Sequence, residues 1–98
     1  MGLFTDSTVG MLVTKVIQST PSSLIIEAED VVKGESYCVV PYSLSSIGIL
    51  PFIYDCIKVG EFISVFGQPS KRANKFRYNS DKKVLRITKL RLQNRRLP

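Results

Sequence analysis

Positively charged side chains alternate with aromatic rings in one stretch of the sequence, between residues 71 and 83. The stretch contains Phe76 and Tyr78, and its basic residues are Lys71, Arg72, Lys75, Arg77, Lys82 and Lys83. Lysine and arginine neutralise phosphates, and aromatic rings stack on flat bases. The combination predicts a site for a single-stranded nucleic acid, with the first four cations on phosphates and the two rings on bases.

The distribution of charge along the chain supports this interpretation. Three basic and seven acidic side chains give residues 1–70 a net charge of −4, whereas eleven basic residues and Asp81 give residues 71–98 a net charge of +10. Charge clustered in this way is typical of a patch that binds polyanions. The alternative is a solvated basic tail, with Lys82 and Lys83 protecting an edge strand from aggregation.

Residues suited to catalysis or metal binding are sparse. The sequence contains no histidine and only two cysteines, Cys38 and Cys56, and it lacks the GxGxxG and P-loop patterns. Its acidic residues form no motif with catalytic spacing. We therefore expect a protein that is not an enzyme and that uses no metal or other cofactor. Both thiols lie in apolar runs and are expected to be reduced and buried, and a disulfide between them is the alternative.

The sequence shows no recognisable targeting or membrane segment. No apolar run approaches the roughly 20 residues that a membrane-spanning helix needs. The first ten residues, MGLFTDSTVG, lack the basic and apolar regions of a secretory signal. We expect an intracellular protein with no membrane association.

Five strands are predicted from β-branched and aromatic residues bounded by turn residues. The predicted strands are Val9–Ser19, Leu24–Glu29, Ser36–Pro41, Glu61–Gln68 and Lys83–Gln93. Phe62 and Phe66 share one face of the fourth strand and are expected to lie in the core. The 98 residues form one domain, with residues 1–8 as an N-terminal arm and residues 94–98 as a basic tail.

Alternation of apolar residues indicates where these strands are irregular. In the first strand, Val13 and Val16 fall on opposite faces, which suits a curved strand. In the fifth strand, Ile87 and Leu90 differ in parity, which predicts a bulge near Thr88–Lys89. Proline predicts a break or bulge at Pro69 and Ser70, and an extension of the fourth strand over Phe76–Tyr78 is compatible with the sequence.

The segment between the third and fourth predicted strands has a different character. After Pro51, the apolar residues Phe52, Ile53, Cys56 and Ile57 recur at helical spacing. This spacing predicts a short helix over Pro51–Lys58 that plugs one end of a barrel. An irregular apolar loop is the alternative.

The order of these elements resembles the OB-fold, a five-stranded Greek-key barrel whose second and third strands and one–two and four–five loops bind oligonucleotides. VGEFISVFGQPS and KVLRITKLRLQN resemble the fourth and fifth strands of replication protein A-type and telomere-type OB domains. The run from CVVPYS onward is similar to the smallest subunit of the CST telomere complex and, less closely, to the small subunit of replication protein A. The resemblance implies an all-β OB barrel with one helix between strands three and four. It also implies single-stranded DNA as ligand, a larger OB-fold protein as partner, and a nuclear role in telomere maintenance or replication.

Within this resemblance, Ser70–Lys83 becomes the four–five loop at the mouth of a binding groove. Further candidates lie on neighbouring strands, and the complete predicted site is Lys15, Tyr37, Lys71, Arg72, Lys75, Phe76, Arg77, Tyr78, Arg86 and Lys89. Phe76 could instead anchor the loop on the barrel, and Tyr37 could be a residue at the edge of the core. Two alternatives remain for function: single-stranded RNA binding, and a structural subunit that binds another protein. In the second alternative, the partner would bind the first half of the chain, where the exposed-looking apolar residues are Val31, Val32, Ile47 and Ile49.

Overall fold

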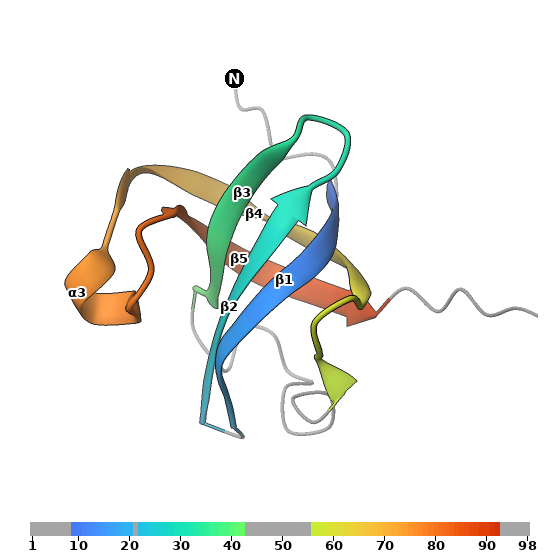
Figure 1. The fold of residues 1–98 in the computed structure, drawn as a ribbon, viewed down its shortest axis with the longest axis horizontal. Coiled ribbons are helices and arrows are strands. Elements are labelled where there is room, and N and C mark those ends of the chain that lie inside the picture. Colours follow the sequence, from blue (N-terminus) through green and yellow to red (C-terminus); the bar gives the residue numbers. More distant parts are fainter. Residues whose placement is uncertain (1–8, 21, 43–55, 93–98) are drawn as a thin grey trace, which may run out of the picture.

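The computed structural model describes residues 9–20, 22–42 and 56–92, and for Lys71 it describes only the backbone. The strands are β1 (Val9–Thr20), β2 (Ser23–Asp30), β3 (Glu35–Pro41), β4 (Phe62–Ala73) and β5 (Lys83–Leu92). They close into a barrel in the order β1-β2-β3-β5-β4 (Figure 1). The predicted all-β, five-stranded barrel is confirmed, and each predicted strand overlaps one in the structure.

Strand pairing gives the barrel an OB-like topology. β1, β2 and β3 form an antiparallel meander, and β4 pairs antiparallel with both β5 and β1. β3 and β5 run parallel, so the chain crosses between non-adjacent strands after β3, as in a Greek key. The helix predicted over Pro51–Lys58 belongs to this crossover and lies largely outside the described residues.

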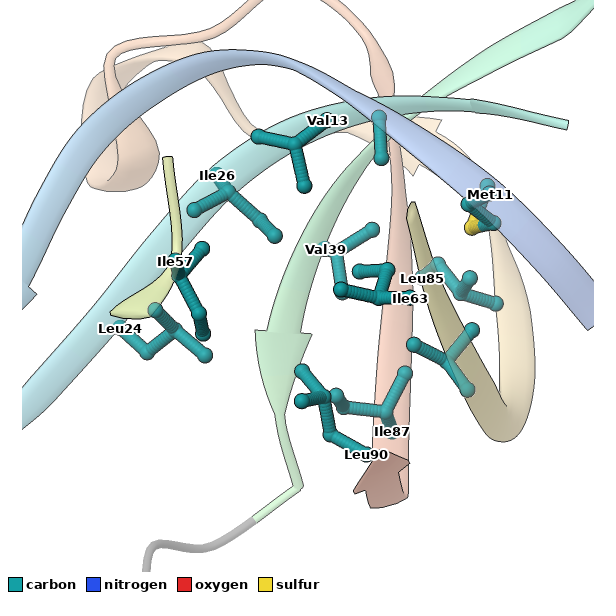
Figure 2. Close-up of a cluster of buried hydrophobic side chains, with 12 residues drawn as sticks. Met11, Val13, Leu24, Ile26, Val39, Ile57, Ile63, Leu85, Ile87 and Leu90 are labelled. Atoms are coloured by element: carbon teal, nitrogen blue, oxygen red, sulfur yellow. The ribbon is translucent and has the colours of Figure 1, made fainter. Parts of the chain in front are cut away.

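One cluster of apolar side chains, contributed by all five strands, fills the barrel. β2 alternates regularly, with Leu24, Ile26 and Ala28 buried on the inner side. Ile57 precedes β4 and packs into the same cluster beside Leu24 (Figure 2). The buried members are Met11, Val13, Leu24, Ile26, Ala28, Val39, Ile57, Ile63, Val65, Leu85, Ile87 and Leu90.

Buried and outward side chains do not alternate regularly along β1. Its pairing with β2 shifts between Val13 and Lys15 and again between Val16 and Gln18. Val16 packs against the main core, as Val13 does, although the sequence placed the two on opposite faces. The predicted parity is wrong because the extra residue at the first bulge reverses which side chains point inward.

Phe62 and Phe66 are not core residues, which corrects the expectation from the sequence. Ile63 and Val65 point into the barrel and are fully buried. Successive side chains of a strand point to opposite faces, so Phe62 and Phe66 lie on the outer side and are only partly buried. Both faces of β4 are apolar, and hydrophobicity alone therefore could not tell inside from outside.

The bulge predicted near Thr88–Lys89 is confirmed. Phe66 pairs with Lys89 while its neighbour Gly67 pairs with Ile87, which leaves Thr88 as the extra residue of β5. The Thr88 hydroxyl donates a hydrogen bond of 3.2 Å to the Phe66 carbonyl and so stabilises the irregular pairing.

β4 runs five residues further than the predicted end at Gln68, through a pairing irregularity between Pro69 and Ala73. The proposed strand extension over Phe76–Tyr78 is wrong, because Lys75–Tyr78 form a single helical turn, α3. Asparagine caps both ends: the Asn74 side chain accepts a hydrogen bond from the Arg77 amide, and Asn79 adopts the left-handed conformation with φ of 57°. No helix within the described ranges is long and apolar enough to cross a membrane.

Replacing Gly67 with alanine tests how closely the β5 backbone approaches the neighbouring strand β4. A Cβ atom at Gly67 would collide with the Arg86 carbonyl oxygen and lie 2.7 Å from the Ile87 Cα atom, both of them backbone atoms. We expect Gly67→Ala to lower the free energy of unfolding by about 1–3 kcal/mol or more, measured by urea denaturation. Gly10→Ala is the control, since its Cβ would meet no atom within 4 Å. Equal stability of the two variants would contradict the close approach.

Candidate nucleic-acid interface

The outer side of β4 and β5 carries a continuous set of cations and rings, which we call the basic face. It consists of the outward side chains of Phe66, Gln68, Ser70, Arg86, Thr88, Lys89 and Arg91, together with Tyr42. Lys89 Nζ lies 5.5 Å from the centroid of the Phe66 ring, its partner across the strand pair. A cation beside a ring offers one ligand both phosphate neutralisation and a stacking surface.

A backbone hydrogen bond holds Tyr42 beside the basic face. Its N–H donates a hydrogen bond of 2.7 Å to the Ile87 carbonyl, which fixes the residue beside β5 just after β3 ends. The Arg86 guanidinium carbon lies 5.8 Å from the Tyr42 ring centroid. The ring is nevertheless 64% exposed and is therefore available to a ligand.

Two grooves run along this surface and meet at Ser70 and Arg86. The larger has a volume of about 640 Å³ and lies among Tyr42, Phe66, Gln68 and Thr88. The smaller has a volume of about 290 Å³ and leads toward α3. Its lining residues are Ser70, Arg72, Ala73, Asn74, Tyr78, Val84 and Arg86. Together they form a path from the middle of β4 and β5 to the segment that holds α3.

The segment Asn74–Lys82, which we call the α3 loop, extends this path with further charge. Lys75 and Arg77 are exposed, and the Phe76 side chain is fully exposed. This exposure rules out the alternative in which Phe76 anchors the loop on the barrel. Tyr78 has that anchoring position instead, because it packs against a second apolar cluster on the outside of the barrel.

The α3 loop is tied to the barrel at Ser80. The buried Ser80 hydroxyl donates a hydrogen bond of 2.7 Å to Glu27 on β2 and accepts one from the Lys82 amide. Beneath it lie Cys38 and Val84, members of the second apolar cluster. Burial raises the pKa of the Cys38 thiol above its ordinary value, an effect that Ser80 partly offsets.

The structure brings most of the predicted site residues together and separates two from the rest. Those on the basic face, in the α3 loop or lining the smaller groove are Arg72, Lys75, Phe76, Arg77, Tyr78, Arg86 and Lys89. Lys71 belongs to β4, but its side chain lies outside the described part of the structure. Lys15 is exposed on β1 opposite Glu27, beyond Leu12, the last residue of β1 that pairs with β4.

Tyr37 is the second predicted residue that lies apart from the basic face. It packs against the main core, and its hydroxyl donates a hydrogen bond of 2.9 Å to the Glu35 carboxylate. Burial, together with the nearby Glu35 charge, raises the pKa of Tyr37 to about 12. The structure thus agrees with the alternative in which Tyr37 is a residue at the edge of the core.

Sequence reasoning missed six residues of the basic face, which are Tyr42, Phe66, Gln68, Ser70, Thr88 and Arg91. Phe66 was assigned to the core, Tyr42 received no role, and Gln68 was counted only as the end of a strand. The pairing of Phe66 with Lys89 follows from the bulge, which the sequence did indicate. The position of Tyr42 depends on the parallel β3–β5 pair, for which the local sequence offers no signal.

The surface that the OB resemblance assigns to oligonucleotides has a different chemistry here. The outward side chains of β2 include Glu27 and Glu29, while those of β3 include the buried Cys38 and Val40. Carboxylates repel phosphates, so this part of the barrel is less suited to a nucleic acid than the β4–β5 side is.

The described residues include no group of three or more His, Cys, Asp or Glu side chains placed to hold a metal ion. Comparison with known proteins adds no assignment: no model of a known family matches the chain, and no curated protein sequence matches it. The fold and the basic face are therefore the observations on which a functional proposal rests.

The two thiols should react at very different rates, which corrects the expectation that both are buried. Both are free in the structure, but Cys38 is buried and Cys56 is exposed. We expect a thiol reagent such as dithionitrobenzoate to label one cysteine rapidly in the native protein and the second only after unfolding, because burial also keeps Cys38 protonated. Cys56→Ser should abolish the rapid phase. Rapid labelling that persists in this variant would contradict the burial of Cys38 beneath the α3 loop.

Proposed function

We propose that the protein binds single-stranded nucleic acid along the basic face and the α3 loop. The observation that carries this proposal is the gathering of cations and accessible rings on one side of the barrel. Residues 62–92 contain nine basic side chains and one acidic one, Asp81. Such a surface can neutralise several phosphates along a strand while its rings stack on the bases between them.

The exposure of Phe76 supports this proposal strongly. A phenyl ring that is fully exposed contributes nothing to the packing of the barrel, and Lys75 and Arg77 flank it. Stacking a base on such a ring contributes roughly 1–3 kcal/mol. The capped turn of α3 fixes the backbone at this position, so less conformational entropy is lost when a base binds than with a flexible loop.

The choice of DNA over RNA, and the biological setting, rest on the resemblance to OB domains. β4 and β5 carry the runs that resemble subunits of telomere and replication complexes, and the OB-like barrel agrees with it at the level of fold. We therefore propose a nuclear protein that acts beside a larger OB-fold protein on single-stranded DNA. RNA is the alternative ligand, because phosphates and bases, which the cations and rings would contact, are common to DNA and RNA.

A second candidate function is protein binding, favoured by one turn of the barrel. Val31 and Val32 lie in the turn between β2 and β3, and Val32 is 89% exposed. Asp30 holds this turn, since its carboxylate accepts hydrogen bonds from the Val32 and Lys33 amides. A rigid turn that presents apolar side chains suits a partner protein, and it lies on a different part of the barrel from β4 and β5.

Charge and stacking respond differently to salt, which allows the two to be tested separately. Replacing Lys75 and Arg77 with alanine should weaken binding to an oligothymidylate and flatten the plot of log affinity against log salt by roughly 1–1.5 units. Replacing Phe76 with alanine should cost about 1–3 kcal/mol and leave the slope nearly unchanged. Fluorescence anisotropy at several salt concentrations measures both quantities.

The charge-matched control is the double variant Lys33→Ala, Lys58→Ala, which removes two exposed lysines outside the basic face. It should bind with nearly the parent affinity and slope. Folding of every variant is checked by circular dichroism. If the correctly folded Lys75→Ala, Arg77→Ala protein binds single strands as the parent does, the α3 loop is not part of the interface and protein binding becomes the better proposal.

A further inference from the structure

The larger groove on the basic face is lined by two aromatic rings and by the side-chain amide of Gln68. Attraction of phosphates and stacking of bases would need only the cations and the rings. We propose that the groove is a pocket for one unstacked nucleobase, with adenine preferred and Gln68 as the residue that reads it. The inference rests on the proposed single-strand binding and adds a specificity that stacking alone does not provide, because every base has an aromatic face.

The size and walls of the groove suit a base. Its volume of about 640 Å³ falls within the range of pockets that enclose small organic ligands. The Tyr42 and Phe66 rings supply apolar walls, and the backbone of Gly67 lines the groove between Phe66 and Gln68. Arg86 and Lys89 lie beside these rings and can neutralise the phosphates on either side of an inserted base.

Among the residues that line the groove, Gln68 is the side chain that offers a hydrogen-bond donor and an acceptor side by side. The Thr88 hydroxyl already bonds the Phe66 carbonyl, and the Ser70 hydroxyl accepts a bond from the Arg72 amide. The Arg86 guanidinium lies over the Tyr42 ring. Gln68 is exposed, and its amide makes no hydrogen bond with any other residue that the structure describes.

The chemistry of a glutamine amide indicates which base it prefers. The amide presents a donor and an acceptor side by side, and adenine offers the matching acceptor and donor at N7 and N6. The Watson–Crick edges that a single strand leaves open also offer an adjacent donor and acceptor on guanine, cytosine and thymine. Adenine differs from guanine because it offers such a pair on both of its edges, at N7 and N6 and at N1 and N6, whereas N7 and O6 of guanine are both acceptors and suit an arginine. A two-ring base also covers more of the Tyr42 and Phe66 rings than a pyrimidine does.

The test compares four fluorescent twelve-nucleotide DNAs: oligothymidylate, and the same strand with one central adenine, guanine or cytosine. We expect the adenine strand to bind about 5- to 150-fold more tightly than oligothymidylate, the range for a good bidentate base contact. Gln68→Met keeps the length of the side chain and removes its amide, and it should abolish the preference for the adenine strand over oligothymidylate. The salt slope should stay nearly the same, because no charge is removed. Gln18→Met, at an exposed glutamine of β1, is the matched control and should keep the preference.

The other outcomes overturn the inference, each in a recognisable way. Equal affinity for all four strands means that the groove reads no base, while the proposed single-strand binding stands. A preference for guanine that is lost in Arg86→Lys means that Arg86, and not Gln68, recognises the base. An adenine preference that survives in Gln68→Met places the reading elsewhere. Failure of the parent protein to bind any strand removes both the inference and the proposed function.

Discussion

The outer surface of this barrel depends on one extra residue in β5. With strict alternation after Ile87, Lys89 would point into the core and Leu90 into solvent. The bulge at Thr88 reverses that parity, so that Leu90 is buried with Ile87 and Lys89 lies against the Phe66 ring. The same register brings the β5 backbone at Arg86 and Ile87 so close to Gly67 that no side chain would fit there. Core packing and the basic face therefore follow from the same local irregularity.

The interior of the barrel is apolar throughout, whereas the charge of its outer surface differs from one side to the other. Glu27 and Glu29 lie on the outer side of β2, while cations and rings occupy the outer side of β4 and β5. The α3 loop joins the two regions, because Ser80 bonds Glu27 while the loop's exposed cations continue the basic face. A single strand attracted by charge would therefore meet β4, β5 and α3 rather than the β2–β3 surface that an OB-fold resemblance suggests.

The sequence predicted the strands and the β5 bulge well, because period-two alternation and its breaks are local signals. It failed where two faces of one strand were equally apolar, as with Phe62 and Phe66, and where asparagine caps outweighed aromatic strand propensity, as at Phe76–Tyr78. The α3 loop could be predicted as a basic segment because Lys75, Arg77 and Lys82 lie close together in the chain. Tyr42 could not be predicted, because only the parallel β3–β5 pair, formed between residues far apart in sequence, brings it beside Arg86.

The central claim is that the ligand surface is the outer side of β4 and β5 with α3. Titrating ¹⁵N-labelled protein with an oligothymidylate, and following the backbone amide shifts by NMR, tests that claim most directly. The account predicts that the largest shifts map to residues 66–78 and 86–91, with the amides of β2 nearly unchanged. Shifts concentrated in β2 and β3, with residues 86–91 unaffected, would contradict it.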